Sequence, residues 1–229
     1  MVKVSAPGKC ILFGEHAVVY GQPALACSIN QRMNIELERE ETFDSWRLDG
    51  RTFNAKKHPH IEFIRNQLPL TNGQPLHIRI RGTIPKASGL GSSAALSVAL
   101  CGALQQLRNG SMDVQQASAI SHQAEAQAQG GRASPMDTAT SAFGGFVVLS
   151  DSIEEDLDFI ETRTMNVNGK QQQWHLHTFE ASIPKGTSLV IGNTGVHAST
   201  STMVRQVADL IQHEPWRKVE LETIGAIAR

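Results

Sequence analysis

The sequence Gly-Leu-Gly-Ser-Ser at residues 89–93 has the composition of a phosphate-binding loop. Two glycines let the backbone approach a ligand closely, and the apolar run that follows at residues 94–100 predicts a helix. The first turn of a helix presents unpaired N–H groups and positive dipole charge, so we expect an anion there. The hydroxyls of Ser92 and Ser93 can bind free amides, a phosphate or a magnesium ion. A plain turn with a serine N-cap explains the same pattern, and the loop alone leaves both interpretations open.

Common nucleotide-binding motifs do not account for this loop. The sequence contains no Gly-x-x-x-x-Gly-Lys-Ser/Thr, and no third glycine follows Ser93 as in dinucleotide-binding and protein-kinase loops. Asp158-Phe159 is followed by Ile160 instead of glycine, and no His-Arg-Asp triplet occurs. If the loop binds phosphate, it must belong to another phosphate-binding class.

Two charged residues elsewhere could complete a phosphoryl-transfer site. Lys9 directly precedes the apolar residues 10–13, and a lysine that enters an apolar run needs a partner such as an aspartate or a phosphate. Glu125 lies in an alanine-rich stretch that predicts a helix. With a serine hydroxyl and phosphate oxygens it could ligate magnesium, or it could be a solvated helix charge.

A third candidate is Asp137, within the sequence Ser-Pro-Met-Asp at residues 134–137. This pattern predicts a helix start with Ser134 as the cap and Pro135 as the first helical residue. An aspartate held at such a helix start is also a candidate proton acceptor for a hydroxyl-bearing substrate. The two interpretations are compatible, because capping would fix the carboxylate in place.

Length and composition predict a globular protein with one large core or two modest domains. The chain has 229 residues, of which 40% are hydrophobic and 19% charged, with a formal net charge of −1. Its basic runs are short, which disfavours nucleic acid and membrane surfaces as partners. The N-terminal residues do not resemble a secretion signal, and no apolar run is long enough to span a bilayer, so we expect a cytoplasmic location.

The cysteines and histidines predict neither a disulfide framework nor a zinc site. The three cysteines are Cys10, Cys27 and Cys101, an odd and widely spaced set that predicts reduced, packed thiols. Two His-x-His pairs, at residues 58–60 and 175–177, lack partners at zinc-site spacing. We therefore expect solvated histidines there.

The order of elements predicts the α+β class, because strands and helices mix without the regular alternation of a doubly wound sheet. Expected strands are residues 2–5, 25–29, 33–37, 76–81, 146–149, 174–179 and 189–191. Expected helices are residues 96–107, 114–129 and 203–211.

Four motifs in a fixed order closely resemble the GHMP kinases. They are Lys-Cys-Ile-Leu-Phe-Gly-Glu-His-Ala-Val-Val-Tyr-Gly at residues 9–21, the loop at 85–95, Ala-Ser-Pro-Met-Asp-Thr at 133–138 and Gly-Asn-Thr-Gly-Val at 192–196. Within that family, residues 14–21 are similar to the mevalonate-phosphorylating members, especially the archaeal ones. The resemblance covers essentially the whole chain.

The resemblance implies transfer of the γ-phosphoryl group of ATP, with Mg²⁺, to the primary hydroxyl of mevalonate, giving 5-phosphomevalonate. Asp137 matches the family's catalytic aspartate, and Lys9 matches the lysine that orients the hydroxyl and stabilises developing charge. Ser93 and Glu125 match the metal ligands. The residues that match the ATP-phosphate loop are Pro85, Lys86, Ala87, Ser88, Gly89, Leu90, Gly91, Ser92, Ser93, Ala94 and Ala95. The residues that match the substrate side are Glu15, His16, Thr138, Ser199 and Thr200.

The family's fold implies two domains. Residues 1–182 would form the N-terminal ATP-binding domain, with a mixed sheet and helices, and residues 183–229 the start of a ferredoxin-like C-terminal domain. We expect that second domain to be incomplete, because the sequence has no late glycine-rich motif. A second departure lies at residues 129–132, which are one residue longer than the usual pattern. Either Glu125 is displaced, or the loop absorbs the extra glycine.

Two alternatives to this function stay open. One is another small-molecule kinase of the same family, acting on phosphomevalonate or galactose. The other is a truncated, catalytically poor ATP-binding module. The expected partners are mevalonate and ATP, and the sequence leaves the oligomeric state, including a homodimer, open.

Overall fold

The computed structural model describes residues 1–40, 42, 44–70, 73–85, 88–131, 133–167, 169–182, 184–192 and 200–228. Of residues 200 and 201 it describes the backbone alone. The described chain forms one eight-stranded sheet with the order β4-β3-β5-β2-β6-β8-β7, in which β1 pairs with β2 off this path. The pairs are antiparallel except for β3 with β5. The strands are β1 Val2–Phe13, β2 Ala24–Arg39, β3 Arg47–Leu48, β4 Arg51–Thr52, β5 Leu76–Gly82, β6 Phe146–Ser150, β7 Asp158–Val167 and β8 Lys170–Phe179.

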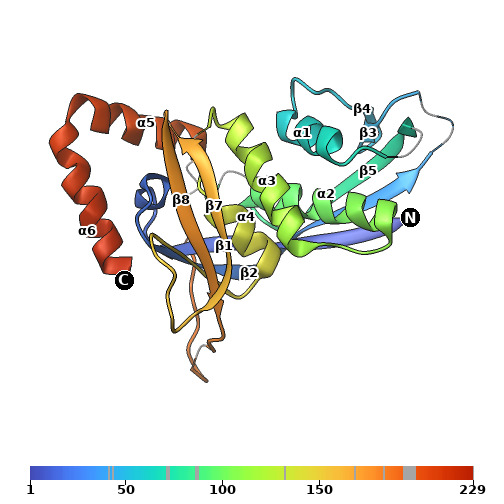
Figure 1. Cartoon of the computed structure of the whole chain (residues 1–229). Coiled ribbons are helices and arrows are strands. Elements are labelled where there is room, and N and C mark those ends of the chain that lie inside the picture. The colour runs from blue at the N-terminus through green and yellow to red at the C-terminus, as the bar shows by residue number, and fades with distance from the viewer. Residues whose placement is uncertain are drawn as a thin grey trace.

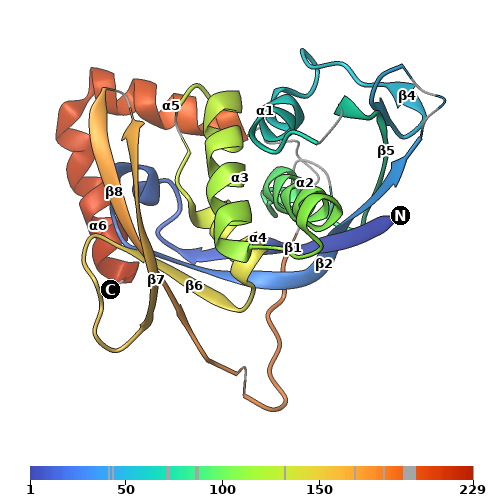
Figure 2. The same cartoon turned by 45° about the vertical axis from the view of Figure 1, so that its right-hand side comes forward.

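Helices cover one face of this sheet, as Figures 1 and 2 show. The α-helices are α1 Pro59–Gln67, α2 Ser92–Asn109, α3 Val114–Ala128, α4 Met136–Phe143, α5 Thr200–His213 and α6 Lys218–Ala228. Two short 3-10 helices are η1 Ala17–Tyr20 and η3 Pro215–Arg217. Helices α2 and α4 lie over β1 and β2, α3 packs against α1, α2 and α4, and α6 packs against η1 at the far end of the sheet. The mixture of one sheet with helices confirms the α+β class.

Two apolar clusters support the two ends of the helical layer. One cluster joins α2 to β2 and β5 and includes Leu100, Leu104 and Ile35. The other joins α4 to β6 and β8 and includes Met136 and Trp174. Because α2 is buried along most of its length, its alanines allow the helix to pack closely on the sheet.

The structure corrects several expected elements. Residues 25–29 and 33–37 belong to one strand, β2, because β1 pairs with both parts of it, on either side of a register shift between Pro7 and Lys9. Residues 189–191 are not a strand: they are exposed and have no ladder partner in the described chain. Helix α4 begins at Met136 with Pro135 as its N-cap and no capping side chain, so the expected Ser134 cap is wrong.

One of the expected solvated histidines is instead buried. His177 lies in the interior of β8, with an exposed fraction of 0%, and its Nε2 accepts a hydrogen bond from the Glu154 amide at 3.1 Å. The three cysteines are free thiols, as expected, although Cys10 is only half-buried.

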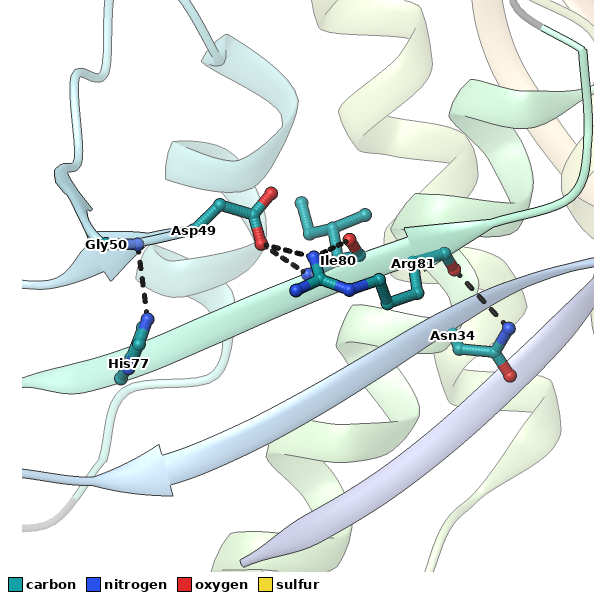
Figure 3. Close-up of polar contacts among 6 residues, drawn as sticks. All are labelled: Asn34, Asp49, Gly50, His77, Ile80 and Arg81. Carbon is teal, nitrogen blue, oxygen red and sulfur yellow. Dashed lines mark hydrogen bonds and ion pairs between the residues drawn. The ribbon is translucent and has the colours of Figure 1, made fainter.

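The edge of the sheet near α1 closes with the short β3–β4 hairpin (Figure 3). Its turn contains Asp49 at φ +48°, and the Asp49 Oδ1 atom accepts hydrogen bonds from the Ile80 amide at 2.9 Å and from Arg81 Nη1 at 3.3 Å. The Gly50 amide donates to His77 Nε2 at 3.2 Å. These contacts fasten the hairpin to β5, and a short edge strand offers little backbone for unwanted pairing.

Within the described residues, no helix combines the length and apolar character needed to cross a bilayer.

Candidate active site

An ion pair with one buried member, Lys9, lies where β1 meets α4. Lys9 is on β1 at a shift in the β1–β2 register, and its side chain is only 4% exposed. Its Nζ atom lies 2.9 Å from Oδ1 of Asp137, in the first turn of α4. The structure therefore supplies the partner that the Lys9 sequence context demands. Removal of Asp137 would leave the buried Lys9 ammonium without this counter-charge, which is destabilising.

The surroundings of Lys9 keep its side chain protonated. Burial works to lower the pKa of Lys9, but the carboxylates of Asp137 and Glu15 outweigh it, and the pKa lies above its ordinary value. An ammonium group is thus held against the Asp137 carboxylate. Such a fixed positive charge can stabilise negative charge that develops on a reacting oxygen.

The phosphate loop, residues 85–95, is fastened to this pair. The Lys9 amide donates to the Leu90 carbonyl oxygen at 3.1 Å, and the Ser88 hydroxyl donates to the Pro85 carbonyl oxygen at 2.8 Å. Gly91 has φ +71°, and a Cβ atom there would lie 2.7 Å from Lys9 Cγ. Glycine is therefore needed at residue 91 both for its backbone and for the close approach of Lys9. Lys86 and Ala87 lie outside the described residues.

Helix α2 begins within this segment, at Ser92, and no side chain caps it. Its N-cap is Gly91, and Ser92 and Ser93 are its first two residues. The interpretation of the loop as an ordinary turn with a serine N-cap is therefore wrong. An uncapped helix N-terminus keeps amide donors available for an anion.

A buried carboxylate joins α3 to the start of α2. Oε1 of Glu125 accepts hydrogen bonds from Ser93 Oγ at 2.7 Å and from Ser97 Oγ at 2.9 Å. Ser93 is exposed at the helix start, whereas Ser97 is completely buried one turn further on. The structure thus brings together the two residues expected to hold a metal ion.

The extra glycine before Asp137 does not displace Glu125. Helix α3 ends at Ala128, and Gly130 and Gly131 then adopt positive φ angles of +66° and +81°. The Gly131 amide donates to the Ala126 carbonyl oxygen at 2.7 Å, which closes the last turn of the helix. Of the two outcomes expected from the sequence, the loop absorbs the additional residue.

The donor set at Glu125 fits magnesium. Burial raises the pKa of Glu125, only partly opposed by the hydrogen bonds from Ser93 and Ser97. Within the part of the chain that the structure describes, no lysine or arginine forms an ion pair with this carboxylate. A buried carboxylate without a counter-charge, beside a hydroxyl at a helix N-terminus, suits a hard cation whose other ligands are phosphate oxygens and water.

A small cavity of about 50 Å³ lies beside Asp137. Three of the expected substrate residues line it: Glu15, His16 and Thr138. The Thr138 hydroxyl donates to the Pro135 carbonyl oxygen at 3.2 Å, so it can only accept a further hydrogen bond. Of the remaining two, Ser199 lies outside the described residues, and of Thr200 only the backbone is described, at the start of α5.

The backbone at His16 is strained. His16 has φ +64° and ψ −45°, and the Ala17 amide donates to the Glu15 carbonyl oxygen at 2.8 Å. This is a γ-turn of the rare kind with positive φ. Such a conformation costs about 1–3 kcal/mol and is found mostly at functional sites. It holds Glu15 and His16 at the wall of the cavity.

Three residues of the site escaped the sequence analysis. Ser97 follows Ser93 by four residues, so the helical repeat places both hydroxyls on one face, and this spacing was a usable signal. Gln129 and Val204 line the cavity, Gln129 from the end of α3 and Val204 from α5. No local pattern distinguishes them from an ordinary helix end and an ordinary apolar helix residue.

Replacement of Glu125 should reveal the cost of burying this carboxylate. Below the ordinary pKa of 4.5 the carboxyl is protonated in both folded and unfolded chains. As the pH rises through the raised folded pKa, ionisation of the buried group lowers the free energy of unfolding. We expect Glu125→Gln to have a higher Tm than the wild type at pH 7 without metal. Each kcal/mol gained in the free energy of unfolding should raise the Tm by about 2–4 °C. The gain should vanish near pH 4, and Glu155→Gln, in an exposed loop, is the control. A gain that is equal at both pH values would contradict this.

A pair of variants tests the strain at His16. Both His16→Gly and His16→Ala remove the imidazole, but only glycine accepts a positive φ without strain. We expect the glycine variant to exceed the alanine variant in free energy of unfolding by about 1–2 kcal/mol, after allowing for the greater freedom of glycine in the unfolded chain. Urea denaturation measures the difference. Equal stability would show that the turn is relaxed.

Comparison with known proteins agrees with the geometry. Residues 56–145 match the family described as GHMP kinases N terminal domain. A mevalonate kinase of Methanothermobacter thermautotrophicus is 34% identical over 215 residues, which are 92% of this chain and 63% of that protein. A mevalonate kinase of Archaeoglobus fulgidus is 37% identical over 157 residues, which are 68% of this chain and 55% of that protein. The chain thus spans less than two thirds of the length of these relatives.

A solved structure shows that the fold is shared. The crystal structure of L. major mevalonate kinase in complex with R-mevalonate superposes with a TM-score of 0.62 at 22% identity, covering 99% of this chain and 67% of that one. Family match, sequence relatives and fold agree, and the chain belongs to the GHMP kinase family.

Proposed function

We propose that this chain carries the active site of a kinase that transfers the γ-phosphoryl group of ATP to the primary hydroxyl of mevalonate, giving 5-phosphomevalonate. The observation that carries the proposal is the Lys9–Asp137 pair at 2.9 Å, placed between an uncapped helix N-terminus and a cavity. Phosphoryl transfer depends mainly on positioning and charge neutralisation. This arrangement has a group for each of those tasks.

Asp137 is the proposed proton acceptor, and Lys9 is its positioning charge. The Asp137 side chain is about one third exposed, at 34%, so a hydroxyl in the cavity can reach it. The Lys9 ammonium lies against that carboxylate and holds it in place. As the hydroxyl oxygen attacks phosphorus, its proton passes to Asp137, while Lys9 stabilises the charge that develops on the oxygen.

The phosphate loop and the amides at the start of α2 are the proposed site for the ATP phosphates. Ser93 and Glu125 would hold Mg²⁺ there, and the bound ion would neutralise charge on the phosphates. The Ser93–Glu125 contact at 2.7 Å supports this, because both oxygens already lie beside the helix start. Pro85, Ser88, Gly89 and Leu90 complete the described part of the loop.

The charge of the cavity favours a neutral hydroxyl as acceptor. Its described lining includes the carboxylates of Glu15, Glu125 and Asp137, and none of the described residues that line it is lysine or arginine. A phosphate as the attacking group, as in phosphomevalonate, would bring negative charge at the reacting atom against these carboxylates, whereas the attacking hydroxyl of mevalonate is neutral, although that substrate carries a carboxylate elsewhere. His16 and Thr138 offer polar contacts to a small substrate. The relatives named mevalonate kinase support the same choice.

The domain division is also a proposal. Residues 1–182 contain the whole sheet, the phosphate loop and the ion pair, which supports their assignment as the ATP-binding domain. Residues 183–229 follow the last strand and supply α5 and α6, which supports their assignment as the beginning of a second domain. Val204 of α5 lines the cavity, so this second segment contributes to the site.

Turnover and binding together test the function. In ³¹P NMR with mevalonate and Mg-ATP, we expect a new phosphomonoester signal, and phosphomevalonate and galactose as alternative acceptors should give none. Asp137→Asn should lose about 10²–10⁴-fold in turnover, as expected for loss of a general base, and retain ATP binding. Asp113→Asn, which alters only the cap of α3, is the control.

The outcomes separate the alternatives. Near-normal turnover by Asp137→Asn would eliminate Asp137 as the base. ATP binding without transfer to any of the three acceptors would instead support a catalytically poor nucleotide-binding module.

A further inference from the structure

Trp174 connects the last strand of the sheet to the wall of the cavity. It lies on β8 with an exposed fraction of 0%, and its indole Nε1 donates a hydrogen bond of 2.7 Å to the carbonyl oxygen of Val18. Val18 is in η1, two residues after the strained His16, and lines the cavity. The contact joins residues that are 156 positions apart in the sequence.

His122 makes the matching contact on the opposite wall. It is buried on α3, and its Nε2 lies 3.0 Å from the carbonyl oxygen of Ala133. Burial is the main reason why the pKa of His122 falls to about 4, so the ring is neutral at physiological pH. Because a carbonyl oxygen can only accept, Nε2 carries the proton. Ala133 also lines the cavity, four residues before Asp137.

The two side chains form one unit. The rings of His122 and Trp174 meet edge to face, with centroids 5.9 Å apart and an interplanar angle of 83°. Arg163, the register partner of Trp174 on β7, donates through Nη1 to the Ser118 carbonyl oxygen at 3.2 Å, one turn before His122 on α3. The β7–β8 hairpin is therefore fastened to α3 beside the ring pair.

We propose that Trp174 and His122 are positioning residues that fix the separation of the two walls of the substrate cavity. This inference rests on the proposed function. One hydrogen bond holds the wall that carries Glu15 and His16, and the other holds the wall that carries Asp137. Because both donors belong to one packed ring pair, neither wall can shift without disturbing the other. Apolar packing alone would fill the same space, but it would leave the two carbonyl groups free to move.

The test removes each donor and keeps an aromatic ring. Trp174→Phe and His122→Phe should each raise the dissociation constant for mevalonate about tenfold by calorimetry, the upper range for one lost neutral hydrogen bond. The dissociation constant for a non-hydrolysable ATP analogue should change less than twofold, because no hydrogen bond joins the described residues of the phosphate loop to either ring. Trp46→Phe is the matched control: Trp46 is also buried, but it packs in the other apolar cluster.

Amide hydrogen exchange on the ligand-free protein gives a second, local readout. Trp174→Phe should speed exchange at the amides of η1 and Gly21, and His122→Phe at those of Ala133, Ser134 and Met136, while Trp46→Phe changes neither. Variants are compared only if their circular dichroism is native, so the failure of one to fold leaves the other to decide.

These results separate the two proposals. If the wild type does not bind mevalonate, the proposed function fails, and local exchange alone then decides the role of the ring pair. If either native variant binds mevalonate like the wild type with unchanged exchange at its own wall, the inference is overturned.

Discussion

The ion pair between Lys9 and Asp137 is the interaction on which the rest of the site depends. It places a positive and a negative charge where a strand and a helix from distant parts of the sequence meet. Lys9 also fixes the phosphate loop, through its amide to Leu90 and its side chain against Gly91. Asp137, the phosphate loop and the cavity are therefore held in fixed positions relative to one another, as the proposed reaction would require.

Around this pair the fold keeps several features that stability alone would not favour. Glu125 is a buried carboxylate whose burial raises its pKa, and His16 has a strained backbone. Lys9 is a buried charge that is stable only because a carboxylate faces it. The large apolar clusters under α2 and α4 offset these costs. The concentration of costly groups at one place is itself a sign of function.

The chemistry of individual residues predicted which side chains form the site better than it predicted the contacts that hold them in place. The demand of Lys9 for a partner and the hydroxyls after a glycine pair could be recognised locally, and the motif resemblance then linked Lys9 to Asp137 and Ser93 to Glu125. The hydrogen bonds of Trp174 and His122 could not be predicted, because each joins segments that only the tertiary fold brings together. The strand expected at residues 189–191 was wrong for a related reason: an apolar run forms a strand only where a neighbour offers its backbone.

A structure of the protein with mevalonate, Mg²⁺ and a non-hydrolysable ATP analogue tests the central claim most directly. The account predicts that the primary hydroxyl of mevalonate lies within about 2.6–3.2 Å of an Asp137 carboxylate oxygen, with the Lys9 ammonium still against that carboxylate. If all ligands are bound and the hydroxyl lies outside hydrogen-bond reach of Asp137, the ion pair is not the centre of the reaction.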